Sequence, residues 1–491
     1  MTDDSTRQWK TLDKDLNRLS RLEQASMHTS RPLVGVGISL VFVSLAAVAA
    51  ALFAGGSPQG LAVIVASAFG AYMALNIGAN DVANNMGPAV GAKALSMLGA
   101  IAIAAVCESA GALLAGGDVV STISTGIVDP QALSSSTIFV RAMMAALLAA
   151  SIWVNIATWI GAPVSTTHAV VGGVMGAGIV AAGFGTVNWP TMGSIAASWV
   201  ISPLLGGIFA AGMLAFIKWR IMYVDDKLAA ARTWVPVLIG IMSAAFATYL
   251  ALKGLKKVIA IDLSHAVLIG IVAGIILGLV SVPFIRRQSR GLENRKASLK
   301  VLFRLPLVIS AGLLSFAHGA NDVANAVGPL AAIASVHETS EVAGQVAIPL
   351  WVMLIGALGI SFGLVLFGPK LIGMVGNQIT KLNPMRAYCV ALSAAVTVIA
   401  ASWLGLPVSS THIAVGGVFG VGFFREWYME RRAQQIERDR PVSDMPHQER
   451  TRRKLVRRSH FMTIIAAWVI TVPAAALMSA GCFLLLRAIG F

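Results

Sequence analysis

The segment GANDVANNMGP at residues 78–88 returns almost unchanged as GANDVANAVGP at residues 319–329. A second pair follows in the same order, because APVSTTHAVVGGVMGAGI at residues 162–179 matches LPVSSTHIAVGGVFGVGF at residues 406–423. The interval from the Asp of the first element to the first Ser of the second is nearly the same in both copies, from Asp81 to Ser165 and from Asp322 to Ser409. Two ordered pairs with similar spacing indicate that the chain is a duplication and folds as two related halves.

The composition is typical of a protein embedded in a bilayer. Of the 491 residues, 57% are hydrophobic and 12% are charged, whereas soluble domains carry about 25% charged residues. The N-terminal segment 1–30 is polar, so no cleavable signal peptide is expected. Many uncharged runs approach or exceed the roughly 20 residues that cross a bilayer core as a helix, and clear examples are 34–55, 61–79, 95–117, 191–217, 265–285 and 344–368. The sequence therefore predicts an all-α polytopic membrane protein with roughly 11–12 spans.

The positive charge lies mainly between the apolar runs. The net charge is +15, and the largest basic cluster lies at 425–459. Lys and Arg near span ends stay cytoplasmic, so this distribution favours an orientation signal with contact to anionic headgroups over binding of nucleic acid. With a cytoplasmic N-terminus and each PVS(T/S)TH segment at the tip of a helical hairpin, six segments become cytoplasmic. They hold 32 of the 37 basic residues: 1–33, 84–94, 218–232, 286–304, 369–386 and 425–459.

In this arrangement the two halves cross the membrane in opposite directions. Inverted-topology repeats of this kind, here with re-entrant helical hairpins, are the architecture of secondary transporters, whose site lies near the midplane where the repeats meet. We expect a multi-pass protein of the cell (inner) membrane with its N-terminus in the cytoplasm. The predicted organisation is a cytoplasmic arm at 1–33, an extra span at 34–57, repeat 1 at 58–217, linking spans and a basic loop at 218–302, and repeat 2 at 303–491, which includes the charged cytoplasmic insertion 425–459.

Each GANDVAN segment places a carboxylate beside an apolar helix. A charged side chain in the bilayer costs about 2.5–3.5 kcal/mol on insertion scales, so Asp81 and Asp322 require a partner or a proton. Oxygen ligands suit hard cations, and helix ends loosened by Gly78 and Gly319 would coordinate sodium as in other transporters. Neighbouring amides offer further oxygens: Asn80, Asn84, Asn321 and Asn325. Helix capping is the alternative role, but two matched copies favour a coupling-cation site, with sodium as a candidate metal at both Asp residues.

The PVS(T/S)TH segments predict a complementary anion site. In each copy a Pro ends one helix, and the first Ser, Ser165 or Ser409, caps the next. The free N–H groups and positive end of a helix bind anions without a basic side chain. Four more hydroxyl residues lie in the first turns: Thr166, Thr167, Ser410 and Thr411. Two such tips could hold one tetrahedral oxyanion, and capping inside a re-entrant loop is the alternative role.

Together the two sites predict symport. Bare carboxylates repel an oxyanion in a low dielectric, so Asp81 and Asp322 must hold cations or share protons with it. Phosphate keeps a proton near neutral pH and can donate it to a carboxylate, whereas sulfate cannot. The predicted function is secondary active import of inorganic phosphate coupled to sodium or protons, with no other cofactor. A sulfate or related oxyanion permease and a channel are the alternatives within this class.

An enzyme is not expected. An intramembrane hydrolase built on Ser165, His168 and Asp81 is a remote alternative. Ser165 does not sit in a GxSxG elbow, and the duplication would give two complete triads without an evident reason.

The paired motifs resemble those of the inorganic phosphate transporter (PiT) family, which includes sodium–phosphate and proton–phosphate symporters and some sulfate permeases. The resemblance runs from about residue 60 to 489 and excludes 425–459. It implies inverted repeats, hairpins that carry the PVS motif and, often, a homodimer. By position it implies that Asp81 and Asp322, with their flanking Asn residues, bind the cation and phosphate. It also implies a phosphate cradle made of Ser165, Thr166, Thr167, Ser409, Ser410 and Thr411.

The resemblance leaves the coupling ion open. Glu108, in the segment CESAGALL, matches a family glutamate that follows the first-motif Asp. It is a candidate proton or sodium site, with a structural hydrogen bond as the alternative. Asn80 before Asp81 resembles the sodium-type members, but residues 138–160 and 387–405 lack the acidic side chains of some sodium-coupled relatives.

Overall fold

The computed structural model describes residues 34–54, 58–160, 164–254, 261–339, 348–375, 382–439 and 458–491. Within these residues the regular elements are helices, apart from an isolated bridge between Val128 and Val187. The predicted arm 1–33 and residues 440–457 of the predicted insertion lie outside the described residues.

Eleven helices in the described part of the chain are long and apolar enough to cross a membrane, and the first of them is Val34–Ala54. Each of the six apolar runs singled out in the sequence overlaps one of these helices, so the predicted all-α polytopic class is confirmed. The other elements that build the bundle are α2 (Pro58–Asn80), α3 (Val82–Gly91), α4 (Met97–Ala115), α5 (Gly117–Ser121), α6 (Ser136–Ile160), α7 (Thr166–Ala182), α8 (Trp189–Ile217), α9 (Lys227–Lys253), α10 (Leu263–Gln288), α11 (Lys296–Leu302), α12 (Arg304–Thr339), α13 (Leu350–Met374), α14 (Pro384–Trp403), α15 (Ser410–Asp439) and α17 (Arg458–Ala488).

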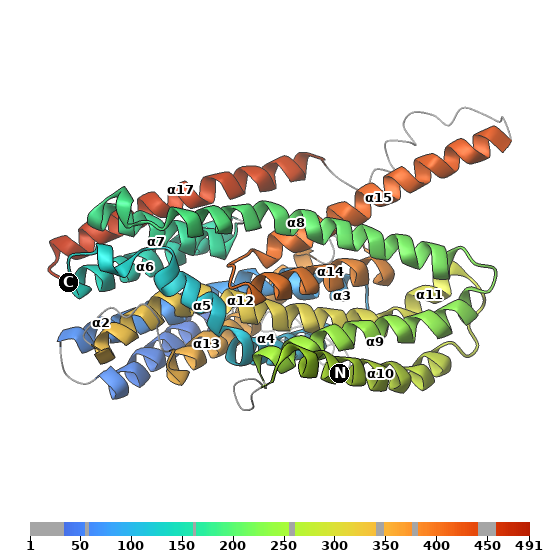
Figure 1. Cartoon of the computed structure of the whole chain (residues 1–491), viewed down its shortest axis with the longest axis horizontal. Helices are drawn as coiled ribbons and strands as arrows, with labels where there is room; N and C mark the ends of the chain where they lie inside the picture. The colour runs from blue at the N-terminus through green and yellow to red at the C-terminus, as the bar shows by residue number, and fades with distance from the viewer. Residues whose placement is uncertain are drawn as a thin grey trace, which may run out of the picture.

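The long helices run along one common direction of an elongated bundle (Figure 1). The α9–α10 pair lies along one edge, and α17 and α15 lie along the opposite edge, with α15 extending past its neighbours. α12 passes through the middle and is the most buried of the candidate spans. The second GANDVAN motif therefore sits on the helix that is best shielded from the surroundings.

Glycines let helices from the two halves touch backbone to backbone. A Cβ on Gly78 of α2 would lie 1.9 Å from a carbonyl oxygen of α13, and one on Gly363 of α13 would lie 2.1 Å from the carbonyl oxygen of Leu75. The contact between α12 and α4 is built in the same way, since a Cβ on Gly319 would lie 2.1 Å from the carbonyl oxygen of Glu108. Small residues permit such close approach between membrane helices. Each motif-bearing helix is thereby packed against a helix of the other half.

The expectation that Gly319 loosens a helix end is wrong. α12 continues without a break through the second GANDVAN motif, whereas the helix of the first copy is interrupted at Asp81, between α2 and α3. The close contact with α4 explains why a glycine stands at residue 319. Only the first copy therefore interrupts its helix at the motif Asp.

We expect Gly363→Ala to lower the free energy of unfolding by about 1–3 kcal/mol, because overpacking a close contact forces the backbones apart. Denaturant titration of the purified protein in micelles measures this change. Gly481→Ala in α17 is the matched control, because no atom of the described residues outside its own helical turn lies within 4 Å of its added Cβ. Equal stability of the two variants would show that the α2–α13 contact does not require glycine.

The PVS tips lie where two neighbouring helices meet. In the first copy α6 packs against α7, and in the second copy α14 packs against α15. Helix α7 begins at Thr166 directly after Ser165, and α15 begins at Ser410 directly after Ser409. The predicted helix starts are thus confirmed in both copies. The inverted orientation of the halves and the re-entry of the hairpins stay predictions.

Candidate functional site

The carboxylate of Asp81 lies between the two PVS tips. Asp81 occupies the break between α2 and α3 and is 2% exposed. Its Oδ2 accepts a hydrogen bond from Thr166 Oγ1 at 2.8 Å, and its Oδ1 accepts one from Thr411 Oγ1 at 3.3 Å. Because Thr166 begins α7 and Thr411 lies in the first turn of α15, two helix N-termini converge on one carboxylate.

One Asn residue of each GANDVAN motif contacts the PVS tip of the other half. Asn84 Nδ2 donates to Thr411 Oγ1 at 2.9 Å, and Asn325 Nδ2 donates to Thr167 Oγ1 at 3.1 Å. Asn84 and Asn325 hold the same position in the two copies of the motif, and so do Thr167 and Thr411. These matched contacts are the ones that a two-fold relation between the halves would produce.

Ser165 and Ser409 act as helix caps, as the sequence predicts. Ser165 Oγ accepts a hydrogen bond from the backbone N–H of His168 at 3.2 Å, and Ser409 Oγ accepts one from that of His412 at 3.3 Å. The two imidazole rings meet edge to face, with 4.7 Å between their centroids. The triad of Ser165, His168 and Asp81 is not formed, because Ser165 Oγ serves the cap and Asp81 accepts from the two Thr hydroxyls.

Asn321 fixes the loop before the second tip. Its Nδ2 donates to the carbonyl oxygen of Leu406 at 3.2 Å, and its Oδ1 accepts from the backbone N–H of Val408 at 3.2 Å. Asn80 is the last residue of α2, is half-buried and takes part in none of the contacts around Asp81. Of the four Asn residues predicted as ligands, only Asn84 and Asn325, which lie three residues after each Asp, contact hydroxyls of the PVS tips.

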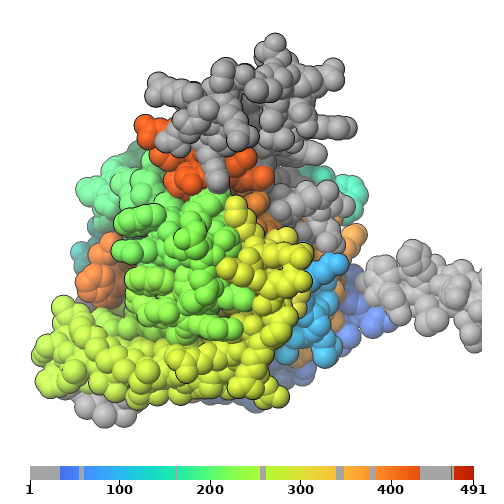
Figure 2. Space-filling model, turned by 90° about the vertical axis from the view of Figure 1, so that its right-hand side faces the viewer, coloured from blue at the N-terminus to red at the C-terminus, as the bar shows by residue number. Residues whose placement is uncertain are grey.

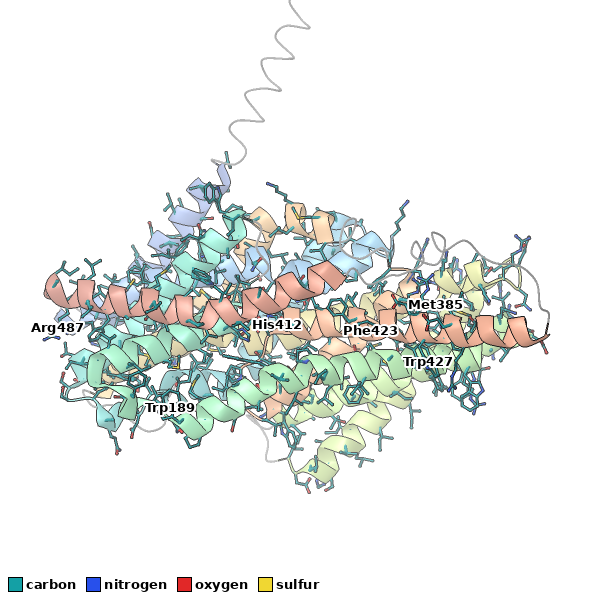
Figure 3. All side chains as sticks on the ribbon, turned by 90° about the horizontal axis from the view of Figure 1, so that it is seen from above. Trp189, Met385, His412, Phe423, Trp427 and Arg487 are labelled. Atoms are coloured by element: carbon teal, nitrogen blue, oxygen red, sulfur yellow. The ribbon has the colours of Figure 1, made fainter. Side chains whose placement is uncertain are left out.

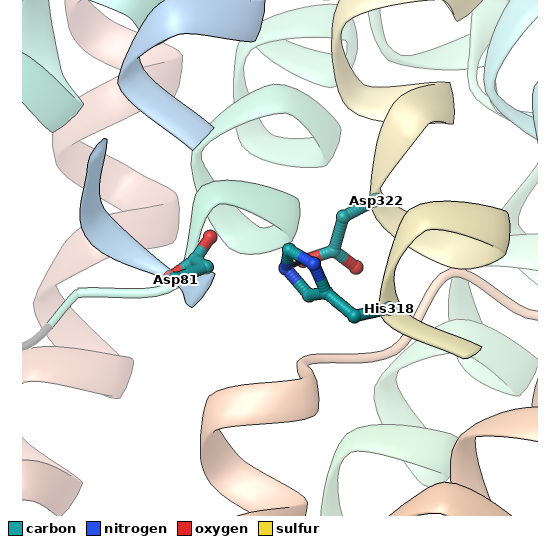
Figure 4. A group of neighbouring side chains, drawn as sticks. All are labelled: Asp81, His318 and Asp322. Carbon is teal, nitrogen blue, oxygen red and sulfur yellow. Dashed lines mark ion pairs between the residues drawn. The ribbon is translucent and has the colours of Figure 1, made fainter. Parts of the chain in front are cut away.

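A buried chain of polar groups links Asp322 to Glu108. His318 Nε2 lies 2.9 Å from Asp322 Oδ2, and His318 Nδ1 lies 2.6 Å from Glu108 Oε2. Asn85 Nδ2 donates to the other carboxylate oxygen of Glu108 at 3.0 Å. Figure 4 shows Asp81 facing His318 and Asp322, and ligand atoms of these three residues lie within 4.8 Å of one another. The two predicted Asp residues therefore meet in one site, with an imidazole between Asp322 and Glu108.

His318 and Asn85 were not among the predicted site residues. The signal for His318 is an ionisable side chain within an apolar run, one helical turn before Asp322, where the first copy has Ile77. Asn85 and Glu108 occur only in the first copy, and His318 occurs only in the second. The chain forms because α4, which carries Glu108, packs against α12.

The buried carboxylates outnumber the positive charges beside them. None of the ion pairs among the described residues joins Asp81, Asp322 or Glu108 to a Lys or Arg. His318 supplies at most one positive charge. Uncompensated buried charges cost several kcal/mol each. The site therefore requires a further cation or added protons.

The oxygen atoms around the site fit a hard cation. Three buried carboxylate or amide oxygens lack a hydrogen-bond partner within the described residues: Asp322 Oδ1, Asn325 Oδ1 and Asn85 Oδ1. Carboxylate and amide oxygens are ligands of hard cations, and sodium binds such groups in secondary transporters. Sodium at Asp81 and Asp322 is thus compatible with the donor set, and protonation of the carboxylates is the other way to balance the charge.

Comparisons with known proteins agree with the motif pattern. The model of the phosphate transporter family matches residues 77–479. A "putative phosphate permease" of Helicobacter pylori strain J99 is 48% identical over 429 residues, which is 87% of this chain and 80% of the relative. A protein of the same description from Pyrococcus abyssi is 37% identical, over 86% of this chain and 97% of its own length. The solved structure of a sodium-dependent phosphate transporter superposes with a TM-score of 0.78 and 36% identity, covering 87% of this chain and 99% of that chain.

Proposed function

Because the chain belongs to the phosphate transporter family, we propose that it is a secondary active symporter that imports inorganic phosphate together with sodium or protons. The family is one of membrane transporters and not of enzymes, and the multi-pass helical architecture agrees with it. The observation that carries the proposal is the position of Asp81 between the hydroxyls of Thr166 and Thr411. A single carboxylate thereby accepts hydrogen bonds from hydroxyls of both PVS tips.

Phosphate would bind between the two tips. Its oxygens would accept hydrogen bonds from the N-terminal N–H groups of α7 and α15, which favour anions. The hydroxyl of Ser410 is buried and has no hydrogen-bond partner within the described residues, so it is available as a donor. We propose that the cradle consists of Ser165, Thr166, Thr167, Ser409, Ser410 and Thr411, which is supported by the convergence of Thr166 and Thr411 on Asp81.

The Thr hydroxyls supply a physical link between cation and anion. Each hydroxyl has one proton to donate, and here Thr166 and Thr411 direct theirs to Asp81. When a cation or proton neutralises Asp81, the carboxylate accepts less strongly, and both hydroxyls can turn to phosphate. Binding of the coupling ion would thus prepare the anion site, and it would lower the net negative charge of the loaded site, which reduces the cost of burying that charge.

The matched contacts Asn84–Thr411 and Asn325–Thr167 support inverted repeats that move against each other. We include in the proposal the predicted repeats at 58–217 and 303–491, a cytoplasmic N-terminus, a location in the cell (inner) membrane and a homodimer. Asn80 and Glu108 are proposed as part of the coupling-ion region, Glu108 through its contact with His318.

Reconstitution into liposomes tests this function. Uptake of labelled phosphate and labelled sulfate is measured under an imposed sodium gradient, an imposed proton gradient, and neither. We expect phosphate uptake to follow at least one gradient and external labelled phosphate to exchange with internal phosphate. Uptake that is independent of both gradients contradicts symport. Preferred uptake of sulfate favours the oxyanion alternative, and absence of phosphate exchange favours a channel.

A further inference from the structure

A long apolar groove lies on the outside of the bundle, and its inner end reaches His168 of the first PVS tip. It is bounded by α8, α15 and α17 and has a volume of about 1100 Å³. Its walls are formed by large apolar side chains with high exposure, including Val200, Leu204, Ile208, Phe423 and Val469. Among the described residues that line it, none is an acidic or basic side chain other than His168 at its inner end.

The groove has the depth of one bilayer leaflet. Its α15 wall extends from Val415 to Trp427, which corresponds to about 18 Å of helix, compared with about 15 Å for half of the hydrocarbon core. Figure 3 shows His412, Phe423 and Trp427 in this order along α15 toward the end of the molecule. Trp427 is 49% exposed, as expected of a side chain at the membrane interface. This length and the exposed Trp427 are those expected of a groove that runs from the headgroup region toward the membrane interior.

Basic side chains contact the aromatic rings at the outer end of the groove. Lys218 Nζ lies 5.0 Å from the ring centroid of Phe424, and the Arg431 guanidinium lies 4.8 Å from that of Trp427. Phe424 and Trp427 both line the groove. Figure 2 looks onto this end of the molecule, where α15 lies beside the end of α8.

Positive charges outnumber negative charges at this end. Arg425 follows Phe424 directly and lies near Arg386 of α14, while Glu426 and Glu430 are the acidic residues on this part of α15. Counting Lys218 and Arg431, the end keeps a positive excess. We call Lys218 and Arg431, which contact the groove-lining rings of Phe424 and Trp427, the basic rim.

We propose that this groove is a binding site for an anionic phospholipid, with an acyl chain between α8, α15 and α17 and the phosphate group on the basic rim. An acyl chain matches the apolar walls and the depth, and a lipid phosphate matches the charge. A second copy of the chain fits less well, because a two-fold interface would present the same basic rim from both partners. The inner end of the lipid would contact His168, next to the Thr167 tip residue.

Native mass spectrometry of the purified full chain, titrated with phosphatidylglycerol or phosphatidylcholine, tests the proposal. We expect phosphatidylglycerol to be retained preferentially. Lys218→Gln/Arg431→Gln should weaken its binding by about tenfold or more, since each basic residue near a membrane surface contributes about 1 kcal/mol. Val200→Trp, which fills the groove, should reduce retention of both lipids.

Two matched variants on α10 serve as controls. Arg286→Gln/Arg287→Gln removes the same charge from the last turn of α10, and Val272→Trp adds the same bulk at another exposed position. Both should retain lipid as the parent does. Equal binding of the two lipids, or equal loss in the rim and control variants, would overturn the proposal.

A further experiment tests the competing occupant. Oxidation of a Phe423→Cys chain in vesicles should yield no more disulfide-linked dimer than oxidation of the parent chain with its natural cysteines. A disulfide-linked dimer found only in the variant would place a second copy on the groove and overturn the lipid site. Thermal unfolding in lipid-free micelles identifies any variant whose fold has changed, and for such a variant Ile208→Trp replaces Val200→Trp as the groove-filling substitution.

Discussion

Asp81→Asn is expected to reduce sodium- or proton-driven phosphate uptake by about 100-fold or more. Hydrogen bonds to a charged group contribute about 1.5–3 kcal/mol each, and Asp81 accepts two, from Thr166 and Thr411. An amide of the same shape keeps the space filled, but it has no negative charge to balance a cation and does not take up a proton near neutral pH. The hydroxyls of Thr166 and Thr411 then no longer face a charged group that also binds the coupling ion. Binding of the ion and binding of phosphate are therefore no longer coupled. Initial uptake rates in liposomes measure the loss.

Asp118→Asn is the control for this substitution. Asp118 is a partly exposed aspartate that pairs with Lys253, and exposed ion pairs contribute about 0–1 kcal/mol. We expect this variant to transport phosphate at nearly the parent rate. If Asp81→Asn also transported at nearly the parent rate, while remaining dependent on the ion gradient, the coupling role of Asp81 would be wrong.

The spans and the helix starts could be predicted from local sequence. A run such as 34–55 has no stable alternative to a helix in hydrocarbon, because every backbone group must be satisfied within the segment. Ser165 and Ser409 could be assigned as caps because a Ser after a Pro-bearing turn has a strong local preference for that position. Duplication added the expectation that the two PVS tips and two GANDVAN motifs share one site.

The contacts between the halves could not be predicted in the same way. Asn80 and Asn321 hold the same position of the GANDVAN motif, yet Asn321 holds the backbone at Val408 whereas Asn80 contacts none of the described groups around Asp81. The difference depends on how the helices cross, which a residue pattern does not specify. The glycine at residue 319 illustrates the same limit, because its reason is a neighbour in the other half of the chain, the carbonyl of Glu108.

The asymmetry of the site depends on tertiary packing as well. Comparison of the two copies highlights what they share, and it therefore passes over His318, which stands opposite Ile77 in the repeat. The functional difference between the halves arises where a residue unique to one copy meets a residue unique to the other. Glu108 and His318 are such a pair.

His318→Ala is expected to lower the free energy of unfolding by about 3–5 kcal/mol, because removing one partner of a buried ion pair leaves the others uncompensated. His318 contacts Asp322 through Nε2 and Glu108 through Nδ1, and all three side chains are almost fully buried. The substitution leaves two carboxylates facing a cavity without a shared partner. Denaturant titration of the purified protein in micelles measures the change.

A double-variant cycle separates this charge effect from simple loss of volume. Glu108→Gln in the His318→Ala background removes one of the unpaired charges while Asn85 still has an amide oxygen to contact, so part of the stability should return. Loss of volume alone would give no recovery. His265→Ala is the control, because its ring pairs with Asp262 at an exposed position and should contribute little. If His318→Ala were as stable as His265→Ala, the His318 imidazole would not be the group that stabilises the buried carboxylates of Glu108 and Asp322. Their charge would then have to be balanced by protons or ions alone.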